Sequence, residues 1–171
     1  MPVRYIHSRL TARQVPDLLQ TILVAELIAP SQCLWLVSPW ISDIPVIDNT
    51  ANTFQALEPS WYRSKIRLSQ ILASLTKQGS VVCVATRPDP HNYSFLETLK
   101  TKADLDYLSL HKAEELHSKG ILSDSFYLAG SMNFTFNGIT VNQETLSYET
   151  EPAAIAEQKL NFRARWGGRV S

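Results

Sequence analysis

Hydrophobic residues recur along the chain with two different periods, and each period predicts one type of element. Where apolar side chains return every three or four positions, as from Val15 to Leu27, one face of a helix is expected to be buried. Where they are continuous, as in CLWLV and VVCVAT, a strand buried on both faces is expected. This pattern predicts helices over residues 11–30, 62–78, 93–102 and 152–166, strands over residues 33–40, 81–86, 105–110 and 140–150, and two strands around a turn within residues 116–133.

The alternation of these elements predicts the fold class. Strand, helix, strand, helix, strand is the order of α/β proteins, in which helices cover a central sheet. Residues 41–60 contain prolines, asparagines and threonines without a sustained period, so a long loop is expected there. Such a loop either serves a function or an interface or is an irregular cover, and the pattern leaves both open. At 171 residues, one domain over residues 1–171 is expected.

Composition and charge place the chain among globular proteins of the cytoplasm. Sixteen basic residues balance sixteen acidic ones, so the broad positive field of a nonspecific nucleic-acid binder is missing, although a local basic patch is compatible with these numbers. Cys33 and Cys83 lie inside apolar runs, which favours buried thiols over a disulfide or a metal site. No apolar run approaches the roughly 20 residues that cross a bilayer, and the first ten residues lack a signal-peptide pattern. We therefore expect a soluble, cytoplasmic protein.

A histidine and a lysine two positions apart begin the predicted strand pair of residues 116–133. Successive side chains of a strand alternate between its faces, so His117 and Lys119 are expected to project together. If residues 123–125 form a three-residue turn, Ser131 lies directly opposite His117 and on the same face. The sheet would then carry an imidazole, an ammonium and a hydroxyl group side by side.

Three further polar residues are spaced along predicted strands so that their side chains can project on the same face as this cluster. Asn133 follows Ser131 by two positions, and Asn142 and Glu144 share one parity in the next predicted strand. Such a set suits a phosphate, because ammonium and amide groups hold its oxygens, histidine attacks or protonates, and glutamate fixes the imidazole tautomer. Alternating polar residues on a strand are more often a solvated face, so the His-x-Lys spacing alone is weak evidence for catalysis.

Taken together, these residues resemble the signature of the phospholipase D superfamily. That signature is His-x-Lys, four residues, Asp, about six residues, Gly-Gly/Ser and then Asn. Here it reads His117-Ser118-Lys119, four residues, Asp124, five residues and Gly130-Ser131-Met132-Asn133, with Glu144 following. The gap after Asp124 is one residue shorter than is usual in the family. LVSPWISD and VVCVATRP are also similar to the family's first half, so the likeness spans residues 32–166.

The resemblance implies a fold, a mechanism and a role for each motif residue. It implies an α/β/α sandwich with a central mixed β-sheet and phosphodiester hydrolysis through a covalent phosphohistidine, with no metal and no other cofactor. The implied roles are His117 as nucleophile and general acid, Lys119 and Asn133 as catalytic phosphate ligands, Ser131 as an assisting phosphate ligand, Glu144 as the group that orients His117, and Asp124 and Gly130 as structural positions.

The family builds one site from two motifs, and this chain carries one. It is therefore similar to the small single-motif members, in which two subunits pair about a two-fold axis through the site, and a homodimer is expected. Those members include nucleases and the cleavage domains of metal-independent restriction enzymes, which favours a nucleic-acid substrate over a lipid. Trp40, just beyond a predicted strand, is a candidate for the wall of the cleft.

A second hypothesis comes from the stretch SPWISDIPVIDN, which looks like phospholipase D-like proteins of 7-deazaguanine DNA-modification clusters. It proposes a partner-dependent component of a bacterial DNA-modification or phage-defence complex, with weak or gated activity of its own. The remaining histidines, His7, His91 and His111, lack metal-ligand spacing, so each is expected to be a surface or packing residue.

Overall fold

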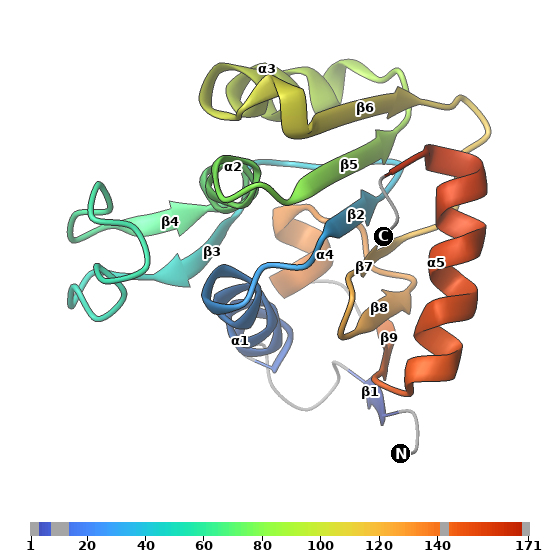
Figure 1. Ribbon diagram of the computed structural model, residues 1–171, viewed down its shortest axis with the longest axis horizontal. Helices are drawn as coiled ribbons and strands as arrows, with labels where there is room; N and C mark the ends of the chain where they lie inside the picture. Colours follow the sequence, from blue (N-terminus) through green and yellow to red (C-terminus); the bar gives the residue numbers. More distant parts are fainter. Residues whose placement is uncertain (1–3, 8–13, 141–143, 169–171) are drawn as a thin grey trace.

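A mixed sheet forms the middle layer of the computed structural model, which describes residues 4–7, 14–140 and 144–168 (Figure 1). Within that part of the chain the sheet has seven strands in the order β1-β9-β8-β7-β2-β5-β6. β2, β5 and β6 run parallel, whereas β7, β8, β9 and β1 join by antiparallel pairing. The strands are β1 (Arg4–His7), β2 (Cys33–Val37), β5 (Val81–Thr86), β6 (Leu108–Lys112), β7 (Gly120–Leu122), β8 (Tyr127–Gly130) and β9 (Thr145–Glu149).

Helices cover both faces of this sheet, which confirms the expected α/β/α sandwich. On one face lie α1 (Gln14–Ile28), α2 (Leu68–Lys77) and α3 (Tyr93–Lys102), and α5 (Pro152–Trp166) crosses the other face (Figure 1). The short α4 (Phe136–Thr140) follows β8 in the chain. In the described part of the chain, no helix is long and apolar enough to span a membrane.

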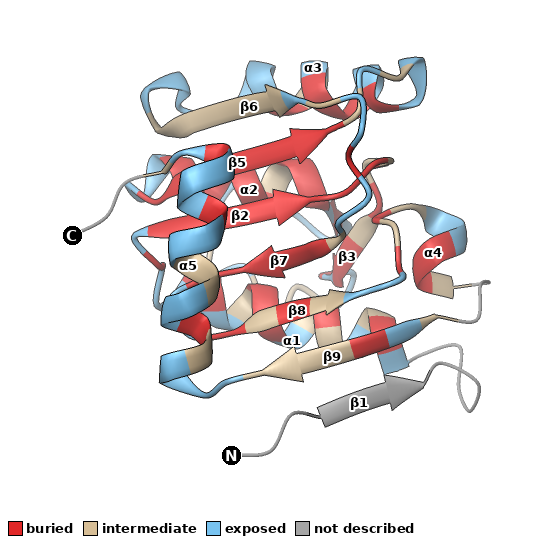
Figure 2. Ribbon diagram, turned by 90° about the vertical axis from the view of Figure 1, so that its right-hand side faces the viewer, coloured by how far each residue is buried: buried red, intermediate tan, exposed pale blue. Residues whose placement is uncertain are grey.

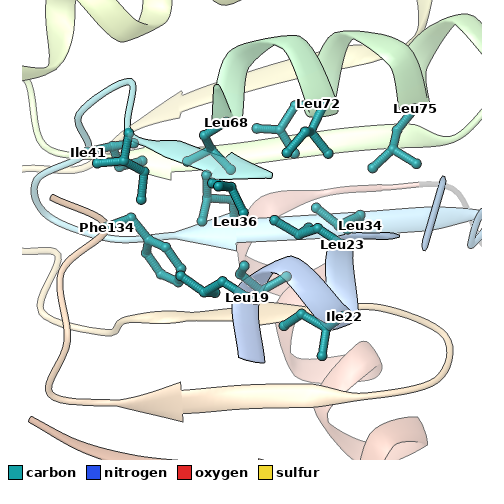
Figure 3. Close-up of a cluster of buried hydrophobic side chains, with 14 of the residues drawn as sticks. Leu19, Ile22, Leu23, Leu34, Leu36, Ile41, Leu68, Leu72, Leu75 and Phe134 are labelled. Atoms are coloured by element: carbon teal, nitrogen blue, oxygen red, sulfur yellow. The ribbon is translucent and has the colours of Figure 1, made fainter. Parts of the chain in front are cut away.

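β2 shows why the apolar run CLWLV is continuous. Leu34 and Leu36 belong to the larger hydrophobic cluster, which α1 and α2 cover (Figure 3). Trp35 belongs to the second cluster, beneath α5, where its indole nitrogen donates to the carbonyl oxygen of Gly167 (2.9 Å) and its ring meets Phe162 edge-on. Because each face of the strand is covered, every position must be apolar.

The two cysteines lie in the cluster beneath α5 as buried free thiols, as their apolar surroundings predicted. Their sulfur atoms are 3.9 Å apart, across the neighbouring strands β2 and β5. The hydrogen bond from Cys33 lowers the pKa of the Cys83 thiol, against the effect of burial.

A small second sheet replaces part of the predicted loop and part of the following predicted helix. It pairs β3 (Pro45–Asp48) with β4 (Lys65–Arg67). Ile47 and Ile66 are partners in this pair and both are buried. The single apolar residue in the β4 segment therefore supports a strand, and its apparent helical spacing with later residues was misleading.

The start of α2 has a specific cause in the preceding loop. The helix was predicted to begin at Tyr62, but it begins at Leu68. Asp43 fixes that start, because its carboxylate accepts hydrogen bonds from the backbone nitrogen and the hydroxyl of Ser69 (2.9 Å each). This carboxylate satisfies a backbone donor that the first turn of a helix leaves unpaired.

The other element bounds agree with the predictions to different degrees. β5, α3 and α5 have the bounds expected from the pattern. β6 is shifted towards the C-terminus, and β9 covers only residues 145–149 of the predicted strand. β1 and α4 were not predicted. The predicted helix start at Thr11 and the candidate Asn142 lie outside the described residues.

Candidate functional site

The motif residues gather at one end of the central sheet, which we call the site end. At this end β2 and β5 finish, β7 begins and β8 finishes, on the right of Figure 2. Parallel strands present their carboxyl ends together, and an antiparallel neighbour presents its amino end there. The His-x-Lys segment precedes β7, and the Gly-Ser-x-Asn segment begins at Gly130, the last residue of β8, so both halves of the motif lie at the site end.

β7 and β8 pair in a register that is one residue away from the predicted one. Gly120 pairs with Ala129 and Leu122 with Tyr127, which leaves a turn of four residues, 123–126, instead of three. β7 also begins after the His-x-Lys segment rather than within it. The prediction that Ser131 lies directly opposite His117 in a strand ladder is therefore wrong.

Side-chain contacts in the turn explain the observed register. The hydroxyl of Ser123 accepts hydrogen bonds from the backbone nitrogens of Ser125 (3.2 Å) and Phe126 (3.3 Å). Phe126 is buried, and its ring stacks on Tyr148 with centroids 6.0 Å apart. Burial of this ring within the turn favours the longer turn.

His117 is exposed at the site end, and its imidazole contacts an arginine. The terminal nitrogen Nη2 of Arg87 lies 3.1 Å from Nδ1 of His117 and 3.4 Å from Nε2. An arginine can only donate hydrogen bonds, so a neutral imidazole is the form of the ring that can accept one from it. A lone pair on the ring is what a nucleophile or a general base requires.

Arg87 is a site residue that the sequence reasoning missed. It follows β5 directly, and three contacts position its guanidinium group. Nε donates to the carbonyl oxygen of Leu116 (2.8 Å), Nη2 reaches His117, and the group lies over the indole of Trp40, 5.0 Å from the ring centroid. The available signal was its place at the carboxyl end of a buried strand, where ligand-binding residues of α/β sheets gather.

Lys119 lies beside His117, although not through strand alternation. Its ammonium group donates to the carbonyl oxygen of His117 (3.0 Å), and its side chain is half-buried. An ammonium group has three donor hydrogens, so this contact leaves capacity for a phosphate oxygen. Arg87 contacts the imidazole of His117 and Lys119 contacts its main-chain carbonyl group, so two cations contact this residue.

Ser131 and Glu144 form a second polar pair at the site end. The hydroxyl of Ser131 donates to Oε2 of Glu144 and accepts from the backbone nitrogen of Thr145 (3.1 Å). The main chains of Ser131 and Thr145 are also hydrogen-bonded (3.1 Å). Glu144 is therefore held at the start of β9 by the motif serine, and its predicted role in orienting His117 stays a prediction.

Asn133 is tied to the end of β2 through a buried serine. The hydroxyl of Ser38 lies 3.3 Å from Oδ1 of Asn133 and 2.9 Å from the carbonyl oxygen of Trp40, and it accepts from the backbone nitrogen of Phe134 (3.4 Å). Within the described residues, the amide hydrogens of Asn133 have no acceptor. This side chain is thus positioned through its oxygen and keeps its donors for a ligand.

Asp124 lies away from the other motif residues, in the turn between β7 and β8. Its carboxylate accepts from the backbone nitrogen of Gln32 (2.7 Å) and forms an ion pair with Lys159 of α5. Its own backbone nitrogen donates to the hydroxyl of Ser31 (3.0 Å). These contacts tie the turn to the start of β2 and to α5, and they leave Asp124 outside the chemistry of the site end.

Gly130 allows β8 and β9 to approach each other next to Ser131. A β-carbon at this position would overlap the carbonyl oxygen of Thr145 and would lie 3.0 Å from Cα of Leu146, both parts of the β9 backbone. Any larger residue must therefore push β9 away. The serine–glutamate pair depends on the distance between these two strands.

We expect Gly130→Ala to lower the free energy of unfolding by about 2 to 3 kcal/mol through this overlap. Gly167→Ala is the matched control, because Gly167 also has a positive φ (68°) but no atom lies within 4 Å of an added β-carbon. The control is expected to lose at least about 1 kcal/mol from backbone strain alone, because φ 68° with ψ −157° is a conformation that essentially only glycine adopts. Urea denaturation of both variants measures the difference, and equal losses would show that the strand approach is not tight.

A cleft at the site end is lined by Trp40 and Asn133, which agrees with the expectation for Trp40. The indole nitrogen of Trp40 donates to Oδ2 of Asp89 (3.2 Å). Hydrogen bonds from the backbone nitrogen of His91 and from this indole hold the pKa of Asp89 below its usual value. His91 is exposed and lines the same cleft, so its surface location is as predicted.

No family model and no curated protein matches this chain in sequence. Solved structures are nevertheless similar to it. A phospholipase D family member, Nuc from Salmonella typhimurium, matches 98% of this chain and 96% of its own length, with a TM-score of 0.62 and 14% identity. NucT from Helicobacter pylori matches 95% of this chain and 94% of its own length, with a TM-score of 0.61 and 13% identity.

Polyphosphate kinase from Porphyromonas gingivalis is similar over only part of its length. It matches 95% of this chain but 26% of its own length, with a TM-score of 0.61 and 14% identity. Identities this low establish the fold and nothing finer. The chain has the fold of the phospholipase D superfamily, which is the fold that its motif residues implied.

Proposed function

We propose that this protein is a metal-independent phosphodiesterase, and more narrowly a nuclease, that works through a phosphohistidine at His117 in a site shared by two subunits. The observation that supports the proposal is that the segment with His117 and Lys119 and the segment with Asn133 lie at the same end of the sheet in a phospholipase D fold. Arg87 adds a second cation at the same place. Nucleophile, positive field and amide donor are the parts that phosphoryl transfer requires.

The first step forms a bond from a ring nitrogen of His117 to phosphorus and breaks the bond to the leaving oxygen. That oxygen takes a proton from the second copy of His117, which a partner subunit supplies. In the second step water attacks the phosphohistidine, and the partner's His117 takes a proton from that water. The nucleophilic histidine is released, so both rings return to their starting state.

The cations and the amide have distinct parts in this scheme. Lys119 and Asn133 hold non-bridging oxygens, whose negative charge grows as the new bond forms. Arg87 contacts the imidazole of His117, and an incoming phosphate would draw its guanidinium group away, since charged acceptors bind arginine more strongly than a neutral ring does. That exchange would free the lone pair of His117 as the substrate arrives. Glu144 would then accept from the other ring nitrogen and fix the tautomer.

A second candidate function is a partner-dependent role in a bacterial DNA-modification or phage-defence complex. The balance of sixteen basic and sixteen acidic residues favours it, because a neutral protein attracts a polyanion weakly and would gain from the basic surface of a partner. Co-purification of such a partner would support the assembly, and turnover by the isolated protein would support the independent enzyme.

We expect the purified protein to cleave a phosphodiester in EDTA at the rate seen with added magnesium, because Lys119, Arg87 and Asn133 already stabilise the developing charge. The measurement is one panel in EDTA: single-stranded DNA, double-stranded DNA, RNA, a chromogenic diester and phospholipid vesicles. The His117→Ala protein, purified in the same way, is assayed in parallel, and its activity is subtracted as the contribution of contaminating nucleases. Loss of all turnover in EDTA with recovery in magnesium would exclude this mechanism, and turnover of vesicles alone would exclude a nuclease.

A further inference from the structure

The cleft at the site end has the size and position to hold the part of a substrate next to the reacting phosphate. Its volume is about 360 Å³, within the roughly 300 to 1,000 Å³ of pockets that hold small organic ligands. Asn133, a proposed phosphate ligand, lines it, whereas His117, Lys119 and Arg87 do not, so the cleft adjoins the proposed phosphate position on the side of Asn133. The rest of its lining consists of two aromatic residues, Trp40 and Phe136, and four polar ones, Ser42, His91, Thr135 and Asn137.

The two aromatic rings differ in how they are held. Trp40 is held by its hydrogen bond to Asp89 (3.2 Å), and the guanidinium group of Arg87 lies over its ring. Phe136, on α4, is 60% exposed, which is high for a large apolar side chain. A fixed ring loses little entropy when a flat group stacks on it, and an exposed ring gains apolar contact from the same event.

We propose that this cleft is a stacking subsite for an unpaired nucleobase of a single-stranded nucleic acid. A base offers a flat π face to the rings of Trp40 and Phe136, and hydrogen-bonding groups at its edge to Asn137 and Thr135. The acyl chain of a lipid would leave those polar groups without partners, at a cost in free energy. The proposal rests on the proposed function, because it names the substrate class of that site.

An unpaired base is required because both faces of a base in a duplex are covered by its stacked neighbours. Only a base in a single strand, or one turned out of the helix, offers a free face. The subsite therefore predicts a preference for single-stranded over double-stranded nucleic acid.

The test measures binding in the His117→Ala protein, so that no cleavage occurs. Fluorescence anisotropy compares a labelled oligothymidylate with an abasic oligomer of the same length and charge. We expect the oligothymidylate to bind about tenfold more tightly, since stacking of one base on an aromatic side chain supplies that order of affinity. Phe136→Leu and Trp40→Leu, each added separately, should remove most of this difference. Trp40→Leu should also weaken binding of the abasic oligomer, because the indole of Trp40 helps to position Arg87.

Two further variants separate stacking from general apolar contact. Phe136→Tyr keeps the π face and should keep the preference for the oligothymidylate. Tyr62→Ala removes another exposed aromatic ring, 71% accessible and outside the cleft lining, and should change nothing. Equal binding of the two oligomers, or a preference that survives both leucine variants, would overturn the subsite.

The outcome of this test is separable from that of the proposed function. Cleavage that depends on His117, together with equal binding of the two oligomers, would leave the phosphodiesterase standing without a base subsite. Base-dependent binding by a protein with no turnover on any substrate would support the subsite and count against the enzyme.

Discussion

Replacement of His117 by alanine is expected to lower phosphodiester turnover by at least about a thousandfold, because the variant loses both the nucleophile and the general acid. The fold should survive. The side chain is exposed, and the hydrogen bonds of its ring among the described residues are with Arg87 alone, so the free energy of unfolding should change by less than about 0.5 kcal/mol. Initial rates on the preferred substrate and urea denaturation measure the two quantities on one preparation.

The neighbouring residue provides a matched control for this substitution. Ser118 is exposed in the same segment, and Ser118→Ala should keep turnover within a few-fold of the wild-type rate. A second readout is chemical: substrate labelled at the scissile phosphorus should transfer that label to wild-type protein and not to His117→Ala. The adduct should survive alkali and be lost in acid, as a phosphorus–nitrogen bond is. A His117→Ala protein that turns over at the wild-type rate would remove the histidine from the mechanism.

Local sequence patterns predicted the layers of the fold better than they predicted the contacts between segments. Continuous apolar runs identify strands with two covered faces, and β5 appears at the expected bounds. β4 could not be found in this way, because one buried residue, Ile66, has no period of its own and depends on pairing with Ile47. The start of α2 depends equally on a distant residue, Asp43.

The candidate site shows the same division between local and distant information. The spacing of His117, Lys119 and Asn133 was visible in the sequence, and the structure brings the segments that carry them to the same end of the sheet. The predicted reason for this proximity, the alternation of side chains along a strand, was wrong. His117 precedes β7, and the turn between β7 and β8 has one residue more than predicted, Phe126. Arg87 was missed because its contact with His117 joins residues 30 positions apart, and no local spacing records that.

A single copy of the motif makes the number of subunits part of the mechanism. One His117 cannot hold the phosphoryl group and protonate the leaving oxygen at the same moment, so the proposed chemistry requires a second proton donor. Two-fold symmetry supplies one if the site ends of two subunits face each other, because each contributes the same residues to the shared centre. His117 is exposed at the site end, so it is accessible to a partner subunit.

When wild-type and His117→Ala subunits are mixed, a shared site is expected to lower the total activity by more than the fraction of variant subunits added. Random exchange of equal amounts of wild-type and His117→Ala subunits leaves about a quarter of the dimers with two histidines, and the mixed half lacks either the nucleophile or the acid. Total activity should therefore settle near one quarter of the all-wild-type value at fixed total protein. Subunits with independent sites would keep about half.

The mixing experiment needs proof of exchange and a variant that isolates the histidine. Native mass spectrometry gives the fractions of the three dimers, and Ser118→Ala subunits, mixed in the same way, should leave the activity near its full value. A mixed dimer purified through two different tags should have almost no turnover, because neither histidine alone can fill both roles. Activity near one half in the exchanged sample, or full activity in a strictly monomeric protein, would exclude the shared site and require another acid beside His117.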